Sequence, residues 1–181
     1  METYYYSQLN SPIGPLNIAV SERGLMLLDF DGGHFPPRNR KFGDASWHES
    51  ASKTQATVRQ LNEYFAGRRK DFNLPLDLRG TSFQKRCWQA LLEIPYGETR
   101  SYAEMARAIG HPLAFRAVGM ANHDNPVAII VPCHRVIASD GTLAGYGGGL
   151  PIKQRLLELE GARWGAHVKI HGQQPLCWRA G

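Results

Sequence analysis

The chain has 181 residues, of which 43% are hydrophobic and 20% charged, a balance typical of an ordinary globular protein. Its net charge of +5 is compatible with a polyanionic partner, although many basic proteins bind no nucleic acid. Three widely spaced cysteines without a CxxC motif exclude a disulfide framework and a cysteine zinc site. The chain has no apolar run of about 18 residues and no secretory signal, so we expect a cytoplasmic protein outside the membrane.

The first third of the chain is predicted to form a small sheet followed by a helix. β-Branched, aromatic and aliphatic residues between Gly- and Pro-containing turns indicate strands at 3–9, 16–20 and 25–30. Residues 31–50 carry Gly, Pro, Asn and scattered charge, and are predicted to form a loop. An apolar stripe predicts a helix over 52–66. Residues 72–78 are predicted to form a further strand, which Pro75 restricts to a sheet edge.

The pattern becomes mainly helical from residue 80 onward. A capping box at 81–84 opens a helix that ends before Pro95. A second capping box at 101–104 opens a helix that runs to Ile109, and residues 114–123 are helical again after a Gly- and Pro-containing break. Two short helices around such a break are typical of a helix-turn-helix, with a plain helical hairpin as the alternative.

The most informative stretch surrounds a cysteine. The aliphatic run 127–131 predicts a rigid, buried strand that Pro132 ends, which would fix Cys133 at the edge of the core. Two basic residues, His134 and Arg135, follow, and nearby positive charge favours the thiolate, the nucleophilic form of cysteine. The alternative is a core cysteine at a strand end, because free cysteine is among the most buried residue types.

A catalytic link between Cys133 and His134 would need a bridging group, because neighbouring side chains diverge in strands and in helices. A water is the simplest bridge, and a carboxylate on the far side of the imidazole would fix its tautomer. Glu160 is the best candidate, because it lies in the last turn of a helix that begins near Pro151. A carboxylate there opposes the helix dipole, so Glu160 is either exposed or held by a cationic or imidazole partner.

The glycine-rich segment 145–149 does not predict a nucleotide site. No GK[ST] follows it, and no strand–GxGxxG–helix unit occurs in the chain. We therefore expect no nucleotide cofactor. A cysteine hydrolase would need an oxyanion hole, and the sequence shows none clearly.

Taken together, these motifs resemble the O6-alkylguanine-DNA alkyltransferases, also called methylated-DNA–protein-cysteine methyltransferases. The resemblance is dense over 80–162 and is carried, in order, by Gly80–Gln84, Ile94–Gly97, Ser101-Tyr102, Arg116–Gly119, Asn125-Pro126, Pro132–Val136, Gly145-Tyr146 and Leu156–Gly161. It is weaker in the N-terminal third, chiefly at Ser11–Leu16.

The resemblance implies an α/β (α+β) fold in two domains. Residues 1–79 would form a small ribonuclease-H-like domain of a sheet and a helix. Residues 80–181 would form a mainly helical, winged-helix-like domain with a helix-turn-helix. The family core would end near residue 162, and Cys177, in the tail beyond it, is expected to be incidental.

The resemblance also implies DNA repair by a single-turnover transfer. The protein would bind double-stranded DNA as a monomer and flip out a guanine alkylated at O6, with O4-alkylthymine as a second substrate. It would then move the alkyl group irreversibly to Cys133, without a cofactor or metal. Two alternatives are an alkyltransferase-like protein that binds damage without transfer and a cysteine hydrolase. Alkyltransferase-like relatives lack the acceptor cysteine, which disfavours the first.

Individual residues take roles from the same resemblance. His134 would polarise a water that deprotonates Cys133, Glu160 would orient His134, and Asn125 would brace the turn that carries the site. Substrate-binding roles fall to Tyr102, which would donate to the leaving guanine, to the backbone of Val136, and to Tyr146 and Gly147. DNA binding would use a recognition helix that lies in the minor groove, where Arg116 would replace the flipped base. The residues with DNA-binding roles are Ala114, Arg116, Ala117 and Gly119 at this helix, and Arg135 near the cysteine.

Two positions depart from the family pattern. Gly147 stands where relatives can carry a small hydroxyl side chain, which leaves only a backbone donor for O6 of the guanine. The bulky Phe115 precedes Arg116, where small residues would help a helix approach DNA closely, so Phe115 either lies at that interface or faces the core. The metal ligands that some relatives carry near the N-terminus are not evident.

Overall fold

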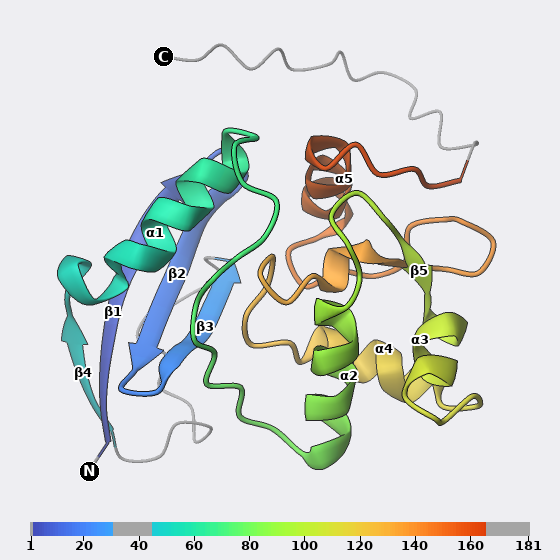
Figure 1. Cartoon of the computed structure of the whole chain (residues 1–181), viewed down its shortest axis with the longest axis horizontal. Coiled ribbons are helices and arrows are strands. Elements are labelled where there is room, and N and C mark those ends of the chain that lie inside the picture. The colour runs from blue at the N-terminus through green and yellow to red at the C-terminus, as the bar shows by residue number, and fades with distance from the viewer. Residues whose placement is uncertain (1, 31–44, 166–181) are drawn as a thin grey trace.

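The computed structural model describes residues 2–30 and 45–165. In these residues a four-stranded sheet and one helix come first, and four helices with two short strands follow (Figure 1). This is the mixed fold that the sequence predicted. No helix within the described ranges is long and apolar enough to cross a membrane.

The N-terminal sheet has the strand order β3-β2-β1-β4. The strands β1 (Glu2–Ser11), β2 (Gly14–Ser21) and β3 (Gly24–Phe30) pair antiparallel in sequence order and confirm the three predicted strands. The strand β4 (Ala45–Glu49) pairs parallel with β1 and corrects the prediction of a loop there. Its sequence, ASWHE, is short and half polar, as expected of an exposed edge strand, and therefore lacks a clear strand pattern.

The segment 72–78 is not the predicted edge strand. Pro75 has no N–H to donate, and its carbonyl accepts a hydrogen bond from Leu25 N at 2.8 Å. Only Leu76 forms a bridge with Leu25. The two segments approach so closely that a Cβ at Gly24 would lie 2.3 Å from the Pro75 oxygen, so the turn at Gly24 requires glycine.

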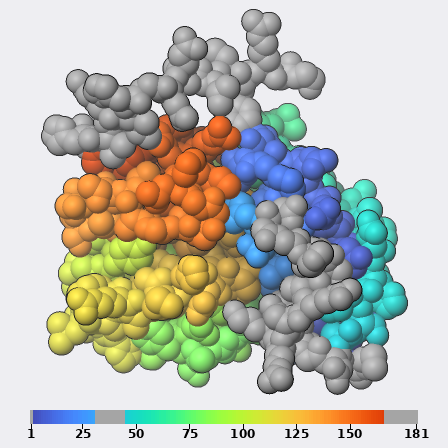
Figure 2. Space-filling model, turned by 180° about the vertical axis from the view of Figure 1, so that it is seen from behind, coloured from blue at the N-terminus to red at the C-terminus, as the bar shows by residue number. Residues whose placement is uncertain are grey.

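The helix α1 (Ala51–Phe65), which confirms the predicted helix, packs on one face of the sheet (Figure 1). The two regions share one hydrophobic core, in which Leu28 and Leu61 of the first region and Trp88 and Leu156 of the second are almost completely buried. Each such side chain contributes about 1.5–3 kcal/mol on burial. The regions therefore stabilise each other, and Figure 2 shows their surfaces abutting.

The second region contains α2 (Ser82–Leu92), α3 (Tyr102–Ala108), α4 (Phe115–His123) and α5 (Leu150–Leu159). Both predicted capping boxes, at Thr81 and Ser101, are formed. The helices α3 and α4 make the predicted helix-turn-helix. Beside them, β5 (Arg100–Ser101) pairs with β6 (Val136–Ile137), which brings the segment after the cysteine next to the start of α3.

The aliphatic run 127–131 is a tight turn, and the strand predicted there is wrong. Val127 forms a single bridge with Leu28, after which Val131 N donates to Val127 O at 2.9 Å. Ile129 adopts a φ of 71°, which is strained for a β-branched residue. Burial of all five side chains gives the run the apolar composition of a core strand, which periodicity cannot distinguish from a buried turn.

Candidate active site

Cys133 begins a short 3-10 helix that ends at Arg135, and 7% of its surface is exposed. Asn125 holds the turn that leads to it: the side-chain Nδ2 donates to Val131 O at 2.7 Å, and Oδ1 accepts from Val127 N at 3.0 Å. The same Nδ2 lies 3.1 Å from Sγ of Cys133. Asn125 therefore braces the turn, as expected, and also contacts the sulfur directly.

Burial raises the pKa of the Cys133 thiol, and the hydrogen bond from Asn125 and the charge of Lys153 offset burial only in part. The expectation that flanking positive charge would favour the thiolate is wrong, because the Arg135 guanidinium faces Glu160 and burial lowers the pKa of His134. Cys133 therefore rests as a thiol. Its reaction as a nucleophile requires a base that removes the proton.

His134 and Glu160 form a completely buried pair. The Nε2 atom of His134 lies 2.8 Å from Oε1 of Glu160. The other ring nitrogen, Nδ1, is buried and has no hydrogen-bond partner among the described residues. Burial lowers the pKa of His134 even though Glu160 favours its protonation, so the imidazole is neutral near pH 7.

Glu160, the residue that caps the C-terminus of α5, receives more hydrogen bonds than the sequence suggested. Its Oε1 accepts from Tyr64 Oη at 2.7 Å and from Arg135 Nη2 at 3.0 Å. Its Oε2 accepts from Arg135 Nε at 2.8 Å and from Gly97 N at 3.2 Å. An ionised carboxylate can only accept, so Nε2 of the neutral His134 carries the proton and Nδ1 is the basic atom.

Arg135 corrects one DNA-binding prediction. Its guanidinium is buried, and besides the bonds to Glu160 its Nη1 donates to Ile94 O at 2.6 Å. It is therefore committed to the interior, where it neutralises the charge of Glu160. The buried Tyr64, like Arg135, was missed as a member of this network, although a buried tyrosine hydroxyl usually has a hydrogen-bond partner.

Lys153 is a further buried group that the sequence did not single out. Its Nζ donates to Val136 O at 2.6 Å and to Ala144 O at 2.8 Å, and burial lowers its pKa to about 8. Lys153 thus ties the segment after Cys133 to the loop that contains Tyr146. The backbone oxygen of Val136, which was expected to bind the substrate, already accepts this bond.

Two of the expected substrate-binding side chains lie within electrostatic reach of the cysteine. Tyr102, the first residue of α3, and Tyr146 both interact electrostatically with Cys133, and burial raises the pKa of each. The Tyr146 hydroxyl is buried without a partner among the described residues, so a ligand can take that bond. Gly147 is exposed, and nothing lies within 4 Å of the position that a Cβ would take there. The space beside Gly147 is therefore open.

The helix α4 presents the expected DNA-binding face. Arg116 and Ala117 are exposed. The guanidinium of Arg116 lies 5.9 Å from the centre of the Phe115 ring. Phe115 is 46% exposed and so does not belong to the core. Gly119 lies beside Tyr102, because a Cβ there would come within 3.8 Å of the Tyr102 ring. The half-buried Ala114 caps the N-terminus of the helix.

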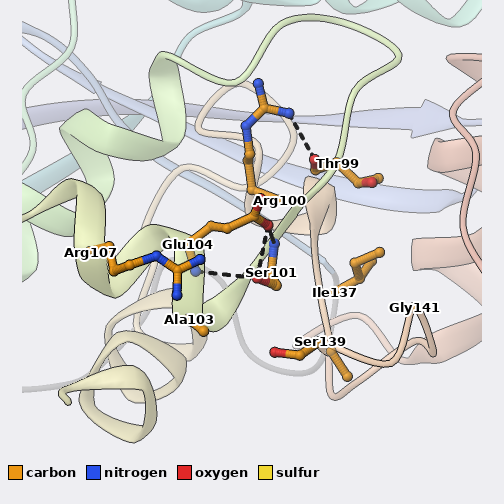
Figure 3. A pocket seen from close by; sticks show the side chains of 10 residues that line it. Thr99, Arg100, Ser101, Ala103, Glu104, Arg107, Ile137, Ser139 and Gly141 are labelled. Carbon is orange, nitrogen blue, oxygen red and sulfur yellow. Dashed lines mark hydrogen bonds between the residues drawn. The ribbon is translucent and has the colours of Figure 1, made fainter. Parts of the chain in front are cut away.

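A polar pocket of about 430 Å³ lies between α3 and the segment 137–141 (Figure 3). Arg100, Ser101, Arg107 and Ser139 are among the residues that line it. Cys133 does not line it, so the pocket is not the place of the reacting sulfur. It adjoins α3 of the helix-turn-helix, and polar side chains line it. No group of His, Cys, Asp or Glu side chains in the described parts of the chain is placed to hold a metal ion.

The ionisation of this network predicts acid sensitivity. Burial raises the pKa of Glu160, but hydrogen bonds from His134 and Arg135 outweigh burial and lower that pKa to about 2. In the unfolded chain the Glu160 carboxylate takes up a proton near its ordinary pKa of 4.5. The stabilisation is therefore complete above pH ~4.5 and is lost as pH falls toward 2, and it amounts to about 3 kcal/mol. His134 acts in the same direction from pH ~6.5 downward, because its folded pKa is lowered.

Urea unfolding of the wild type and Glu160→Gln between pH 7 and pH 3 measures this effect. The variant is expected to be less stable at pH 7, because Arg135 loses its partner, and to lose less free energy of unfolding as the pH falls. Equal pH dependence in the two proteins would contradict the assignment.

Two models of known protein families match this chain, and together they span most of the residues that the structure describes. The family model described as "6-O-methylguanine DNA methyltransferase, ribonuclease-like domain" matches residues 4–78. The model described as "6-O-methylguanine DNA methyltransferase, DNA binding domain" matches residues 82–162, which include Cys133, His134 and Glu160.

Individual relatives match over nearly their whole length. The methylated-DNA–protein-cysteine methyltransferase of Methanosarcina barkeri is 53% identical over 156 residues, which cover 86% of this chain and 96% of the relative. The protein of the same name from Mycobacterium tuberculosis is 51% identical over 166 residues, 92% and 98% of the two chains. A crystal structure of the M. tuberculosis O6-methylguanine methyltransferase has a TM-score of 0.78 at 50% identity and covers 91% and 96%. A second structure of that protein, in complex with DNA, also has a TM-score of 0.78 at 50% identity and covers 88% and 92%.

Proposed function

Because this chain belongs to the 6-O-methylguanine DNA methyltransferase family, we propose that it repairs DNA by moving alkyl groups from O6 of guanine to Cys133. One observation carries the proposal: the buried Cys133 thiol is followed in the chain by a neutral His134 whose tautomer Glu160 fixes. The presence of Cys133 argues against a protein that only binds damage. The family match disfavours the cysteine hydrolase. An alkyl thioether has no hydrolytic exit, so each molecule acts once.

The transfer follows from the roles of three side chains. A water between Sγ and Nδ1 of His134 passes the thiol proton to the imidazole, while the Nε2 proton stays on His134, hydrogen-bonded to Glu160. The sulfur attacks the alkyl carbon, so an S–C bond forms as the C–O6 bond breaks and its electron pair moves to the guanine. Tyr102 donates a proton to the departing base and recovers one from the imidazolium. The products are neutral guanine and an S-alkyl Cys133.

Double-stranded DNA carrying O6-alkylguanine is the proposed partner, with O4-alkylthymine as a second substrate. The atom under attack is not accessible inside the base stack, so the nucleotide must be flipped into the site. The exposed face of α4, with Ala117 and Gly119 flanking the minor groove and Arg116 in the vacated space, suits that task. The polar pocket beside α3 and the net charge of +5 favour contact with the phosphates.

We place the boundary between the two domains near residue 80, which agrees with the end of one family match and the start of the other. We propose that the protein acts as a monomer, a state that sedimentation equilibrium with and without DNA measures. A cytoplasmic location suits the free thiols of Cys87 and Cys133, because oxidation of Cys133 would remove the acceptor.

Intact mass spectrometry tests the function directly. The protein is incubated with duplex DNA that contains one O6-methylguanine, and with the same duplex containing guanine. The expected result is a gain of one methyl group per molecule, with the first duplex only and with no further turnover. Unchanged mass together with loss of the methyl group from DNA would indicate a hydrolase, and unchanged mass with tight binding would indicate a damage-binding protein.

Replacement of Arg116 by alanine should separate base flipping from chemistry. If Arg116 holds the space left by the flipped base, Arg116→Ala slows repair of duplex DNA by about 10-fold or more, since holding a base out of the stack is worth a few kcal/mol. Reaction with free O6-benzylguanine, which needs no flipping, should change by less than about 2-fold. Arg68→Ala, an equal loss of exposed charge in the turn after α1, is the matched control. Equal losses on the two substrates would contradict this role.

A further inference from the structure

Cys133, the bridging water, His134 and Glu160 form the proposed proton relay. This relay extends into the first region of the protein through Tyr64. Its hydroxyl donates to Oε1 of Glu160 at 2.7 Å, across a sequence separation of 96 residues. The same oxygen lies 2.8 Å from Nε2 of His134. Of the described residues that hydrogen-bond Glu160, Tyr64 alone comes from α1, and Figure 1 shows the C-terminal end of α1 in the upper part of the view, where α5 lies.

We propose that Tyr64 is a positioning residue of the transfer reaction. It fixes the Glu160 oxygen that receives Nε2–H of His134, and it thereby couples the N-terminal region to the reactivity of Cys133. The proposal rests on the proposed function for the identity of the reaction, and on the described contacts for the role of the tyrosine.

The surroundings of Tyr64 hold its hydroxyl in one place. The side chain is completely buried, and its ring packs against those of Phe65, Phe72 and Tyr96, with centroids 5.4, 5.4 and 6.1 Å away. A ring packed on several sides has little freedom to follow a moving partner. Glu160, in contrast, caps the end of a helix, where a carboxylate opposes the helix dipole and needs external donors.

The charge on Glu160 explains why this hydroxyl matters for chemistry. Burial and the neighbouring carboxylate raise the pKa of Tyr64 well above its ordinary value, so Tyr64 stays protonated and donates at every working pH. This bond and those of Arg135 spread the negative charge of the carboxylate over several donors. Loss of the Tyr64 bond would concentrate charge on Oε1 and stabilise the imidazolium form of His134, which cannot accept the thiol proton.

Tyr96 provides a matched comparison. It lies against Tyr64, but its hydroxyl donates to the backbone oxygen of Leu159 at 3.1 Å and not to Glu160. Tyr64→Phe and Tyr96→Phe therefore each delete one hydroxyl from the same cluster. Only the first deletion changes the relay, so a purely structural role of the cluster would affect the two variants alike.

The test compares the two variants in alkyl transfer with saturating O6-methylguanine DNA and in ¹⁵N NMR titration of the histidines. For Tyr64→Phe we expect transfer at pH 7 to slow roughly 3–10-fold, less than loss of the base itself, and the acid limb of the rate profile to move to higher pH. The His134 resonance, identified by its absence in His134→Ala, should titrate at higher pH. Tyr96→Phe should leave the acid limb and the His134 titration where they are in the wild type.

The two readouts separate this proposal from the proposed function. A wild-type protein that transfers no alkyl group refutes the function, and the NMR titration, which needs no substrate, still decides the effect of Tyr64 on His134. An unchanged His134 titration in Tyr64→Phe overturns the proposal, whatever happens to stability or rate. Equal shifts in Tyr64→Phe and Tyr96→Phe overturn it as well, because they would arise from the cluster as a whole.

Discussion

Replacement of Cys133 by alanine is expected to abolish alkyl transfer and to leave DNA binding unchanged. Cys133 directly precedes the neutral, oriented imidazole of His134 in the chain, and alanine offers no atom that could accept the alkyl group. The substitution removes one atom from a site at the edge of the core, so it should destabilise the fold by no more than about 1–2 kcal/mol. The residual transfer measured by intact mass should be zero within detection.

The matched control for this prediction is Cys87→Ala. Cys87 is also buried and burial also raises the pKa of its thiol, but it lies within α2 on the packed face of the helix, without an imidazole partner in the described structure. Peptide mapping of the wild type after reaction should place the methyl group on Cys133. Cys177 lies outside the described residues, and the same map assesses it. A methyl group on Cys87 or Cys177, with Cys133 unmodified, would sink the assignment.

Local patterns made much of the fold predictable. The three N-terminal strands alternate with Gly- and Pro-containing turns, and both capping boxes, at Thr81 and Ser101, place a helix start within one residue. Elements without a local pattern were missed or misassigned. The edge strand β4 is too polar to stand out, and the run 127–131 is apolar because it is buried, not because it is extended.

The candidate site was predictable only where its residues lie in recognisable motifs. Cys133, His134, Glu160 and Asn125 were inferred in this way, and the structure brings them together, although their catalytic roles remain proposals. The contacts of Tyr64 and Arg135 depend on which distant segments meet, and no spacing in the sequence encodes that. The family resemblance assigned Arg135 to DNA binding, whereas its buried guanidinium pairs with Glu160.

The structure also changes the electrostatic argument about the nucleophile. The sequence suggested a thiolate stabilised by neighbouring cations, but burial dominates and the cysteine is held as a thiol. A resting thiol is less open to oxidation than an exposed thiolate. That property suits a residue that can react only once, since any earlier modification would inactivate the protein. Reactivity must then come from proton removal inside the closed site.

Replacement of His134 by alanine is expected to slow transfer by about 10²–10⁴-fold, because a positioned base typically contributes that much to the rate. Affinity for DNA should stay within about 2-fold of the wild-type value, since the imidazole is buried and is not exposed at the protein surface. Single-turnover rates at saturating O6-methylguanine DNA measure the first effect, and titration with unmodified duplex measures the second. Glu160→Gln should slow transfer too, because the amide can donate to Nε2 and favour the wrong tautomer.

Two further comparisons make the His134 result specific. His48→Ala removes an exposed imidazole from the edge strand β4 and should leave the rate unchanged. Raising the pH should partly restore transfer in His134→Ala, because the Cys133 thiol then ionises without a base, whereas an unfolded variant would recover nothing. Charge on Glu160 remains paired with Arg135 and Tyr64 in this variant, so the fold should persist. An unchanged rate in both His134→Ala and Glu160→Gln would mean that the thiol loses its proton by another route.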